Sequence, residues 1–202
     1  LAITGIVAMF VAATPALYIP LLTSPLKWVV MLAPLGFIFF LGFKVQSMSA
    51  SAVQATFWAF AAVMGLSMAS IFLVFTGSSI ARTFFVTAAA FGALSLYGYT
   101  TKRSLSAMGS FMVIGLFGII IASLVNIFLG STGLQFVISI LGVVIFAGLT
   151  AWDTQRLKEM YFEADRDSTT KMAVMGALTL YLDFINMFQF LLQFMGVRSN
   201  QE

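Results

Sequence analysis

The sequence predicts an all-α integral membrane protein with seven transmembrane helices and a cytoplasmic N-terminus. Apolar residues make up 61% of the 202 residues and charged residues only 8%, whereas a typical soluble domain is about 25% charged. So few charges cannot cover the surface of a soluble globule of this size, which excludes a soluble enzyme and a disordered chain. The apolar residues also form long runs with short polar breaks between them, as helices that cross a bilayer do.

Seven apolar runs justify the helix count, because each is about as long as the roughly 17–25 residues that a helix needs to span the hydrocarbon core. Each break contains Gly, Pro, Ser or charged residues, which are typical of helix ends. A transmembrane barrel would instead alternate polar and apolar residues over segments of about ten. We therefore predict one domain over residues 1–202, with spans at 1–19, 27–43, 52–75, 82–99, 105–129, 134–154 and 172–195.

The orientation follows from the basic residues, which concentrate in cytoplasmic loops. If the N-terminus is inside, seven basic residues lie inside and three outside. The inner set is Lys44, Lys102, Arg103, Arg156, Lys158, Arg166 and Lys171, and the outer set is Lys27, Arg82 and Arg198. Because the sequence is already apolar at Leu1, we expect a polar leader before it. Small residues share one face of the fifth span at Gly115, Gly118 and Ala122, which predicts close helix packing there.

Two residue types are missing from the sequence, Cys and His. Their absence excludes disulfides, thiolate nucleophiles, an imidazole base and metal sites that use either residue. No phosphate-binding glycine loop or serine nucleophile elbow is present. The net charge of +3 is small and scattered, which gives nucleic-acid binding little support. The sequence therefore predicts neither an enzyme nor a bound cofactor.

The carboxylates have an uneven distribution along the chain. Residues 1–152 contain no Asp or Glu; the first is Asp153, four follow within 154–171, and Asp183 lies inside the last apolar run. Asp183 is about twelve residues past Lys171, or ~18 Å along a helix, which places it near mid-bilayer. An ionisable side chain at that depth is costly, so it normally faces protein or water and has a partner.

The last span also carries a polar stripe, because Thr179, Asp183, Asn186 and Gln193 recur at helical spacing. We expect this helix to pack in the interior of the bundle and these side chains to line a polar path. Taken from the residues alone, Asp183 could instead make one structural hydrogen bond between helices. Asp153 could form a surface ion pair with Arg156, and segment 154–171 could either continue the sixth helix or form a solvated loop.

Three segments resemble the transmembrane Bax inhibitor motif family, and the chain looks like a bacterial member. Residues 180–186 (LYLDFIN), followed by Phe188, Leu191, Leu192 and Gly196, resemble the seventh-helix signature of the family. Residues 91–106 (FGALSLYGYTTKRSLS) resemble its fourth-to-fifth helix region, and residues 150–155 (TAWDTQ) the end of its sixth helix. The resemblance covers residues 80–196 well, whereas the first three spans match mainly in hydropathy.

This resemblance implies a seven-helix bundle of a bacterial inner membrane, with the last helix at its centre. In relatives, one aspartate on the sixth helix and one on the seventh share a proton and sense pH; by motif these are Asp153 and Asp183. Relatives also carry a basic residue near the cytoplasmic end of the second helix, for which Lys44 is the candidate here. The family is associated with a pH-dependent calcium leak, and some relatives with cell death or with a membrane-bound protease.

Physical chemistry is compatible with these implied roles. Calcium prefers several oxygen ligands, so Asp153 and Asp183 could contact it transiently while it permeates. Two carboxylates one hydrogen bond apart cannot both ionise without strong repulsion, so one proton is retained and its loss would push the helices apart. Contact between the two aspartates requires the sixth helix to continue past residue 154, or the seventh to begin near Ser168.

Three hypotheses follow for the function. The first is a pH-sensitive calcium leak channel or exchanger gated by the two aspartates. The second is a membrane interaction protein that modulates a membrane-bound protease or a stress pathway, for which the charged segment 154–171 is the candidate contact. The third is a small-solute transporter that uses the polar stripe; we rank it last because we find no internal repeat of the kind that transporters show.

Overall fold

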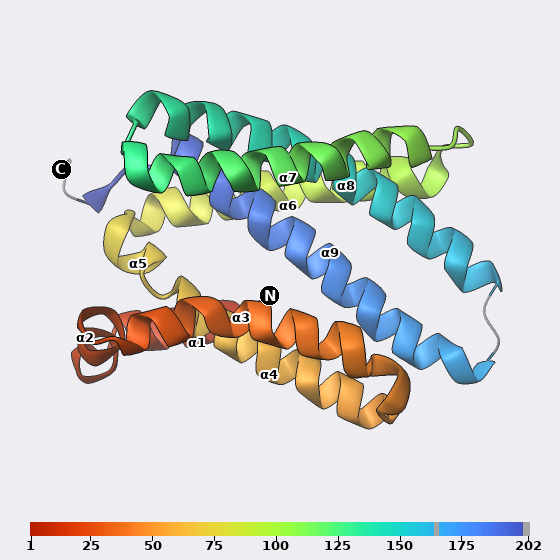
Figure 1. The fold of residues 1–202 in the computed structure, drawn as a ribbon, viewed down its shortest axis with the longest axis horizontal. Coiled ribbons are helices and arrows are strands. Elements are labelled where there is room, and N and C mark those ends of the chain that lie inside the picture. The colour runs from red at the N-terminus through yellow and green to blue at the C-terminus, as the bar shows by residue number, and fades with distance from the viewer. Residues whose placement is uncertain (164–165, 200–202) are drawn as a thin grey trace. The chain divides into compact units, whose positions relative to one another are not determined.

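The computed structural model describes residues 1–163 and 166–199, and most of these residues are helical. The described ranges form nine α-helices, which are labelled in Figure 1. Their bounds are α1 Ala2–Ala12, α2 Pro15–Thr23, α3 Leu26–Lys44, α4 Ala50–Met68, α5 Ile71–Val74, α6 Gly77–Thr100, α7 Ser106–Leu129, α8 Thr132–Glu163 and α9 Arg166–Met195, with a short 3₁₀ turn at Val45–Ser47. The predicted all-helical class is confirmed.

Six segments are long and apolar enough to cross a membrane, or seven if one bent pair counts as a single span. The bent pair is α1 and α2, which meet at an angle of 95°. Pro15 begins α2, and Thr14 before it has the extended conformation that proline favours in the preceding residue. The first predicted span, residues 1–19, is therefore two helices rather than one, and the prediction of a continuous helix there is corrected. The cytoplasmic position of the N-terminus remains a prediction.

The chain divides into two compact units. The first comprises residues 1–77, 170–175 and the described residues after 196. Within it α1 packs closely on α4. The hydroxyl of Thr4 on α1 donates to the carbonyl oxygen of Ala61 on α4 at 3.0 Å. A β-carbon on Gly65 of α4 would lie 2.6 Å from the carbonyl oxygen of Thr4, so the two helices meet where Gly65 has no side chain. The C-terminal end joins this unit where the backbone N–H of Thr76 donates to Val197 at 3.1 Å.

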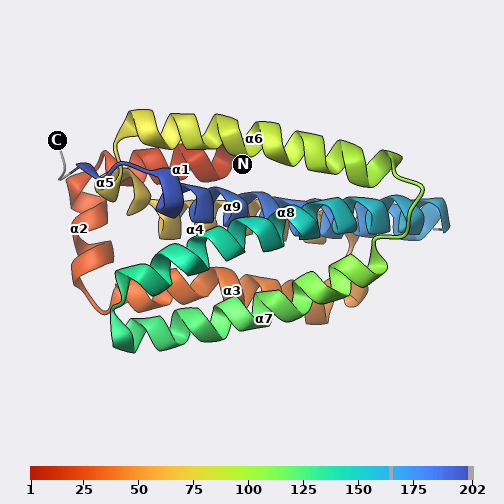
Figure 2. The same ribbon diagram turned by 90° about the horizontal axis from the view of Figure 1, so that it is seen from above.

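The second unit comprises residues 78–169 and 176–196, so it holds most of α6 to α9 and both aspartates. Figure 2 shows the connection between α6 and α7 at one end of these helices and the turn between α7 and α8 at the other. That second turn begins at Gly130, whose φ of 58° lies in the left-handed region that favours glycine. The predicted small face of α7 is present in part: Gly115 faces Ile145, whereas Gly118 has open space beside it.

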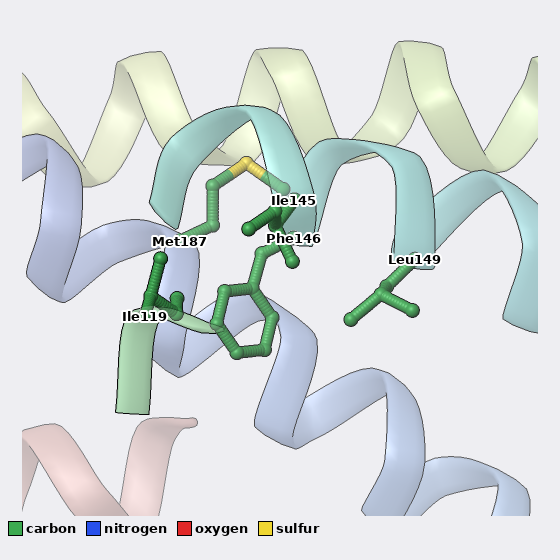
Figure 3. Close-up of a cluster of buried hydrophobic side chains, with 5 residues drawn as sticks. All are labelled: Ile119, Ile145, Phe146, Leu149 and Met187. Atoms are coloured by element: carbon green, nitrogen blue, oxygen red, sulfur yellow. The ribbon is translucent and has the colours of Figure 1, made fainter. Parts of the chain in front are cut away.

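The core of the second unit joins three of its helices, as Figure 3 shows. The buried cluster consists of Ile119 on α7, Ile145, Phe146 and Leu149 on α8, and Met187 on α9. The fourth helix joins through aromatic rings, since Phe184 on α9 lies 5.6 Å from Phe84 and 5.5 Å from Phe91, both on α6. Within this unit α9 therefore contacts each of the other three helices, which is how Asp183 comes to be surrounded by protein.

Candidate functional site

The site depends on the length of α8, which runs to Glu163, nine residues past the predicted end of the sixth span. Residues 154–163 include Gln, Arg, Leu, Lys, Glu and Met, which favour helix, so the helix continues after the apolar run stops. α9 begins at Arg166. Either condition stated for contact between the aspartates would have sufficed, and both hold, with Asp153 well inside α8. The solvated-loop alternative for the first half of segment 154–171 is wrong.

Asp153 and Asp183 lie together in the interior of the second unit. Asp153 is 7% exposed and Asp183 is 4% exposed, and a hydrogen bond joins their side chains. An ionised carboxylate can only accept hydrogen bonds, so a hydrogen bond between two carboxyl groups requires a proton on one of them. The second oxygen of Asp183, Oδ2, is buried and has no hydrogen-bond partner among the described residues. The two carboxyl groups are therefore placed to share one proton.

A cavity of about 550 Å³ opens beside the two carboxyl groups. Its polar lining comes from Asp153, Asp183, Thr179, Asn186 and Ser123. The remaining wall is apolar and is contributed by α7, α8 and α9: Val113, Leu116, Ile119, Ile120, Leu124, Ile127, Phe146, Leu149, Trp152, Leu182 and Phe190. A cavity with apolar walls and a few converging polar groups is the usual form of a binding site, and here those groups include two acids.

Arg156 provides the nearby positive charge on α8. Its guanidinium lies 5.5 Å from the centre of the Trp152 ring and acts on the charge of Asp153 through space. The burial of Asp153 and its bond to Asp183 show that a simple surface ion pair with Arg156 does not describe this residue, so that alternative is wrong.

The predicted polar stripe of α9 divides into two places. Thr179 and Asn186 line the cavity with Asp183, and the amide of Asn186 donates to the carbonyl oxygen of Leu182 on its own helix at 2.8 Å. Gln193 lies further along α9 and accepts a hydrogen bond of 2.6 Å from the Gln135 amide of α8. The stripe thus contributes two residues to the cavity, whereas Gln193 joins helices.

Lys44, the predicted basic partner, is exposed at the end of α3. It belongs to the first unit, whereas both aspartates belong to the second. Its role beside the aspartates therefore stays a prediction.

A residue that the sequence reading missed is Gln155, two positions after Asp153. Its side chain is 6% exposed and bonds the backbone of the connection between α6 and α7 at two points: its Nε2 donates to Arg103 at 2.9 Å, and its Oε1 accepts from the N–H of Leu105 at 2.8 Å. The sequence signal was weak, because a glutamine beside charged residues usually faces water. Its position within the TAWDTQ segment was the only indication.

The site offers few ligands for a resident metal ion. Within residues 1–163 and 166–199, no three or more His, Cys, Asp or Glu side chains gather where they could hold a metal. Calcium takes six to eight oxygen ligands in stable sites. The side chains that bring oxygen atoms to the cavity are those of two aspartates, two hydroxyl residues and one asparagine: Asp153, Asp183, Ser123, Thr179 and Asn186.

Comparisons with known proteins identify the family. A family model described as "Inhibitor of apoptosis-promoting Bax1" matches residues 1–200. An uncharacterized protein of Rickettsia prowazekii is 46% identical over 99% of this chain and 85% of its own length. A second from Caulobacter vibrioides is 50% identical over 86% of this chain and 70% of its own length. The inner membrane protein YbhL of Escherichia coli is 44% identical over 98% of this chain and 86% of its own length.

These matches confirm the resemblance seen in the three sequence segments, and they extend it to the first three spans. With its long apolar helices and an inner membrane protein among its relatives, the chain is a multi-pass protein of the bacterial inner membrane, and it belongs to the Bax inhibitor-like family.

Proposed function

We propose that this protein is a pH-sensitive calcium leak channel or exchanger in which the proton shared by Asp153 and Asp183 holds the path closed. The observation that carries this proposal is the hydrogen bond between two buried carboxyl groups beside a cavity. A carboxyl pair that can hold one proton changes its charge by one unit when that proton leaves. This change provides a pH response in a sequence that has no histidine.

Loss of the proton supplies the free energy for opening. Two unit charges ~4 Å apart repel by about 4 kcal/mol at the effective dielectric of ~20 that suits protein sites. An equilibrium between two conformations commonly differs by a few kcal/mol, so repulsion of this size is enough to shift it. Because Asp153 lies on α8 and Asp183 on α9, the repulsion acts to separate these two helices.

Opening also creates the attraction for the cation. With both carboxylates ionised, the cavity holds two negative charges together with the polar side chains of Thr179 and Asn186. Divalent calcium matches this charge and its preference for oxygen ligands. The small number of ligands leaves binding weak enough for the ion to move on, which suits a leak rather than a storage site.

Calcium flux into proteoliposomes that carry an internal calcium dye tests the proposal. We expect wild-type flux to rise from acidic to alkaline buffer. Asp153→Asn and Asp183→Asn each leave a single carboxyl in the pair, so flux should lose most of its pH response in both variants. Glu159→Gln is the matched control, because it removes an exposed carboxylate from the same helix and should keep the wild-type response. If both Asn variants retain the wild-type flux and pH response, the proposed gate is wrong.

A further inference from the structure

We propose that Gln155 is a positioning residue for Asp153: together with Gly98 and Gly109 it fixes the α8 backbone on both sides of this aspartate, so that the carboxyl group meets Asp183. The consequence for ion flux rests on the proposed function, whereas the consequence for the carboxyl pair does not. Three separate contacts, each to a different segment of the second unit, carry the inference.

The first contact is the pair of hydrogen bonds made by the Gln155 amide. The amide bridges the carbonyl oxygen of Arg103 and the N–H of Leu105. Leu105 is the N-cap residue immediately before α7, so Gln155 satisfies one of the N–H groups that a helix start leaves without a partner. Because the amide is buried and uses both its donor and its acceptor, sliding or rotating α8 would leave polar groups unpaired in the interior.

The second and third contacts are made by glycines just before Asp153. A β-carbon on Gly98 of α6 would overlap the carbonyl oxygen of Ala151. A β-carbon on Gly109 of α7 would overlap the indole ring of Trp152. In both places the neighbouring helix approaches as closely as the absence of a side chain permits, so α8 cannot move toward α6 or α7 there.

The helical geometry combines these contacts into a clamp, by which we mean the contacts of Ala151, Trp152 and Gln155. Residues of an α-helix are spaced about 100° apart around its axis, so Ala151 and Gln155, four residues apart, share one face of α8, whereas Trp152 and Asp153 lie on other sides. The shared face meets α6 and the connection between α6 and α7, and Trp152 meets α7. The remaining side carries Asp153 to Asp183 on α9.

The charged groups around the clamp are few, and Gln155 itself does not titrate. α9 presents Asp183. α8 presents Arg156 over the Trp152 ring and Lys158, whose ammonium donates to the carbonyl oxygen of Tyr99 on α6 at 2.7 Å. The connection between α6 and α7 carries Lys102 and Arg103, and the sequence of α7 contains no titratable residue. Replacing Gln155 leaves all these charges in place, so any effect on the carboxyl pair must act through geometry.

The test compares Gln155→Met with Gln135→Met in full-length protein in vesicles. Both glutamines are on α8, about 30 Å apart along the helix, and both make two side-chain hydrogen bonds to other segments. Infrared difference spectra between acidic and alkaline buffer report the carbonyl stretch of protonated carboxylic acids. The part of this signal that Asp183→Asn removes belongs to the pair. Calcium flux is measured on the same samples.

We expect Gln155→Met to reduce the pair's infrared signal by at least about half and Gln135→Met to leave it unchanged. In flux, the ratio of alkaline to acidic rates should fall about tenfold toward one in Gln155→Met, since two ordinary hydrogen bonds bias an equilibrium by about that factor. If wild type shows the infrared signal but no flux, the proposed function fails and the infrared comparison still decides the inference.

Two results would overturn the inference. One is a folded Gln155→Met protein with the wild-type infrared signal. The other is an equal loss of signal in both Met variants, because this would show that any weakening of α8 disturbs the pair. Should Gln155→Met not yield folded protein, Gly109→Ala takes its place, since its added methyl group pushes on Trp152 without altering a polar group; an unchanged infrared signal in that variant also overturns the inference.

Discussion

Gly98 on α6 lies directly against the carbonyl oxygen of Ala151 on α8, with no room for a β-carbon between the two backbones. Two helices that approach this closely gain many van der Waals contacts. They also lose the ability to adjust, since any side chain at residue 98 forces the backbones apart. This contact lies two residues before Asp153, and the geometry of the carboxyl pair therefore depends on a position that carries no functional group.

Gly98→Ala should lower the free energy of unfolding by about 1–3 kcal/mol, the usual range for overpacking a tight contact. Gly92→Ala is the matched control on the same helix, because no atom lies within 4 Å of the position its β-carbon would take. That variant should be neutral or slightly stabilised by the higher helix propensity of alanine. Thermal unfolding in detergent, followed by circular dichroism, measures both. Equal effects at the two positions would contradict the proposed tight contact.

Phe184→Ala should be among the most destabilising single substitutions in the second unit. The ring is 4% exposed and contacts Phe84 and Phe91 of α6, so its removal leaves a cavity and should cost about 3–5 kcal/mol. Phe128→Ala on α7 serves as the control, because that ring is 90% exposed and should change stability little. The midpoints of thermal unfolding in detergent compare the two, and a Phe128→Ala effect as large as that of Phe184→Ala would count against this packing.

The fold class could be predicted because the hydropathy of each segment is read from the sequence alone and does not depend on tertiary contacts. The break between α1 and α2 was missed for the same reason: hydropathy does not change there, and only Pro15 marks it. The end of α8 was left open, because the charged residues after Thr154 are compatible both with a continued helix and with a solvated loop; the structure continues the helix to Glu163.

The candidate site was predictable only in part. Asp183 could be found from the residues alone, as an acid within an apolar run. Its pairing with Asp153 came from the resemblance to a family, since nothing local indicates which two helices meet. Gln155 was indicated only by its position in the TAWDTQ segment, and Gly98 and Gly109 were not singled out, because what distinguishes all three is the tertiary contact each makes.

The hydrogen bond between Gln135 and Gln193 should contribute measurably to the stability of the second unit. It joins α8 to α9 at 2.6 Å, and Gln135 also accepts from Asn126 of α7 at 3.2 Å. In a double-mutant cycle of Gln135→Leu and Gln193→Leu, we expect a coupling free energy of about 0.5–2 kcal/mol, as for other polar contacts between membrane helices. Unfolding in detergent–denaturant mixtures measures it. A cycle between Gln135→Leu and Asn186→Leu is the control, since Asn186 bonds its own helix; similar coupling there would contradict the assignment.

Asp183→Asn should abolish a pH dependence of stability that the wild-type protein shows. The hydrogen bond between the carboxyl groups of Asp153 and Asp183 requires a proton in the folded state, whereas the carboxyls of the unfolded chain release theirs near about pH 4 and are already ionised at neutral pH. Because the folded state then binds more protons than the unfolded state, the free energy of unfolding should fall as pH rises, by at most about 1.4 kcal/mol per pH unit for one proton. In Asp183→Asn the amide donates to Asp153 at any pH, which removes the need for a proton and flattens the curve. Thermal unfolding across a pH series measures this, with the exposed Glu159→Gln variant expected to follow wild type; stability that rises with pH in the wild-type protein would contradict proton sharing.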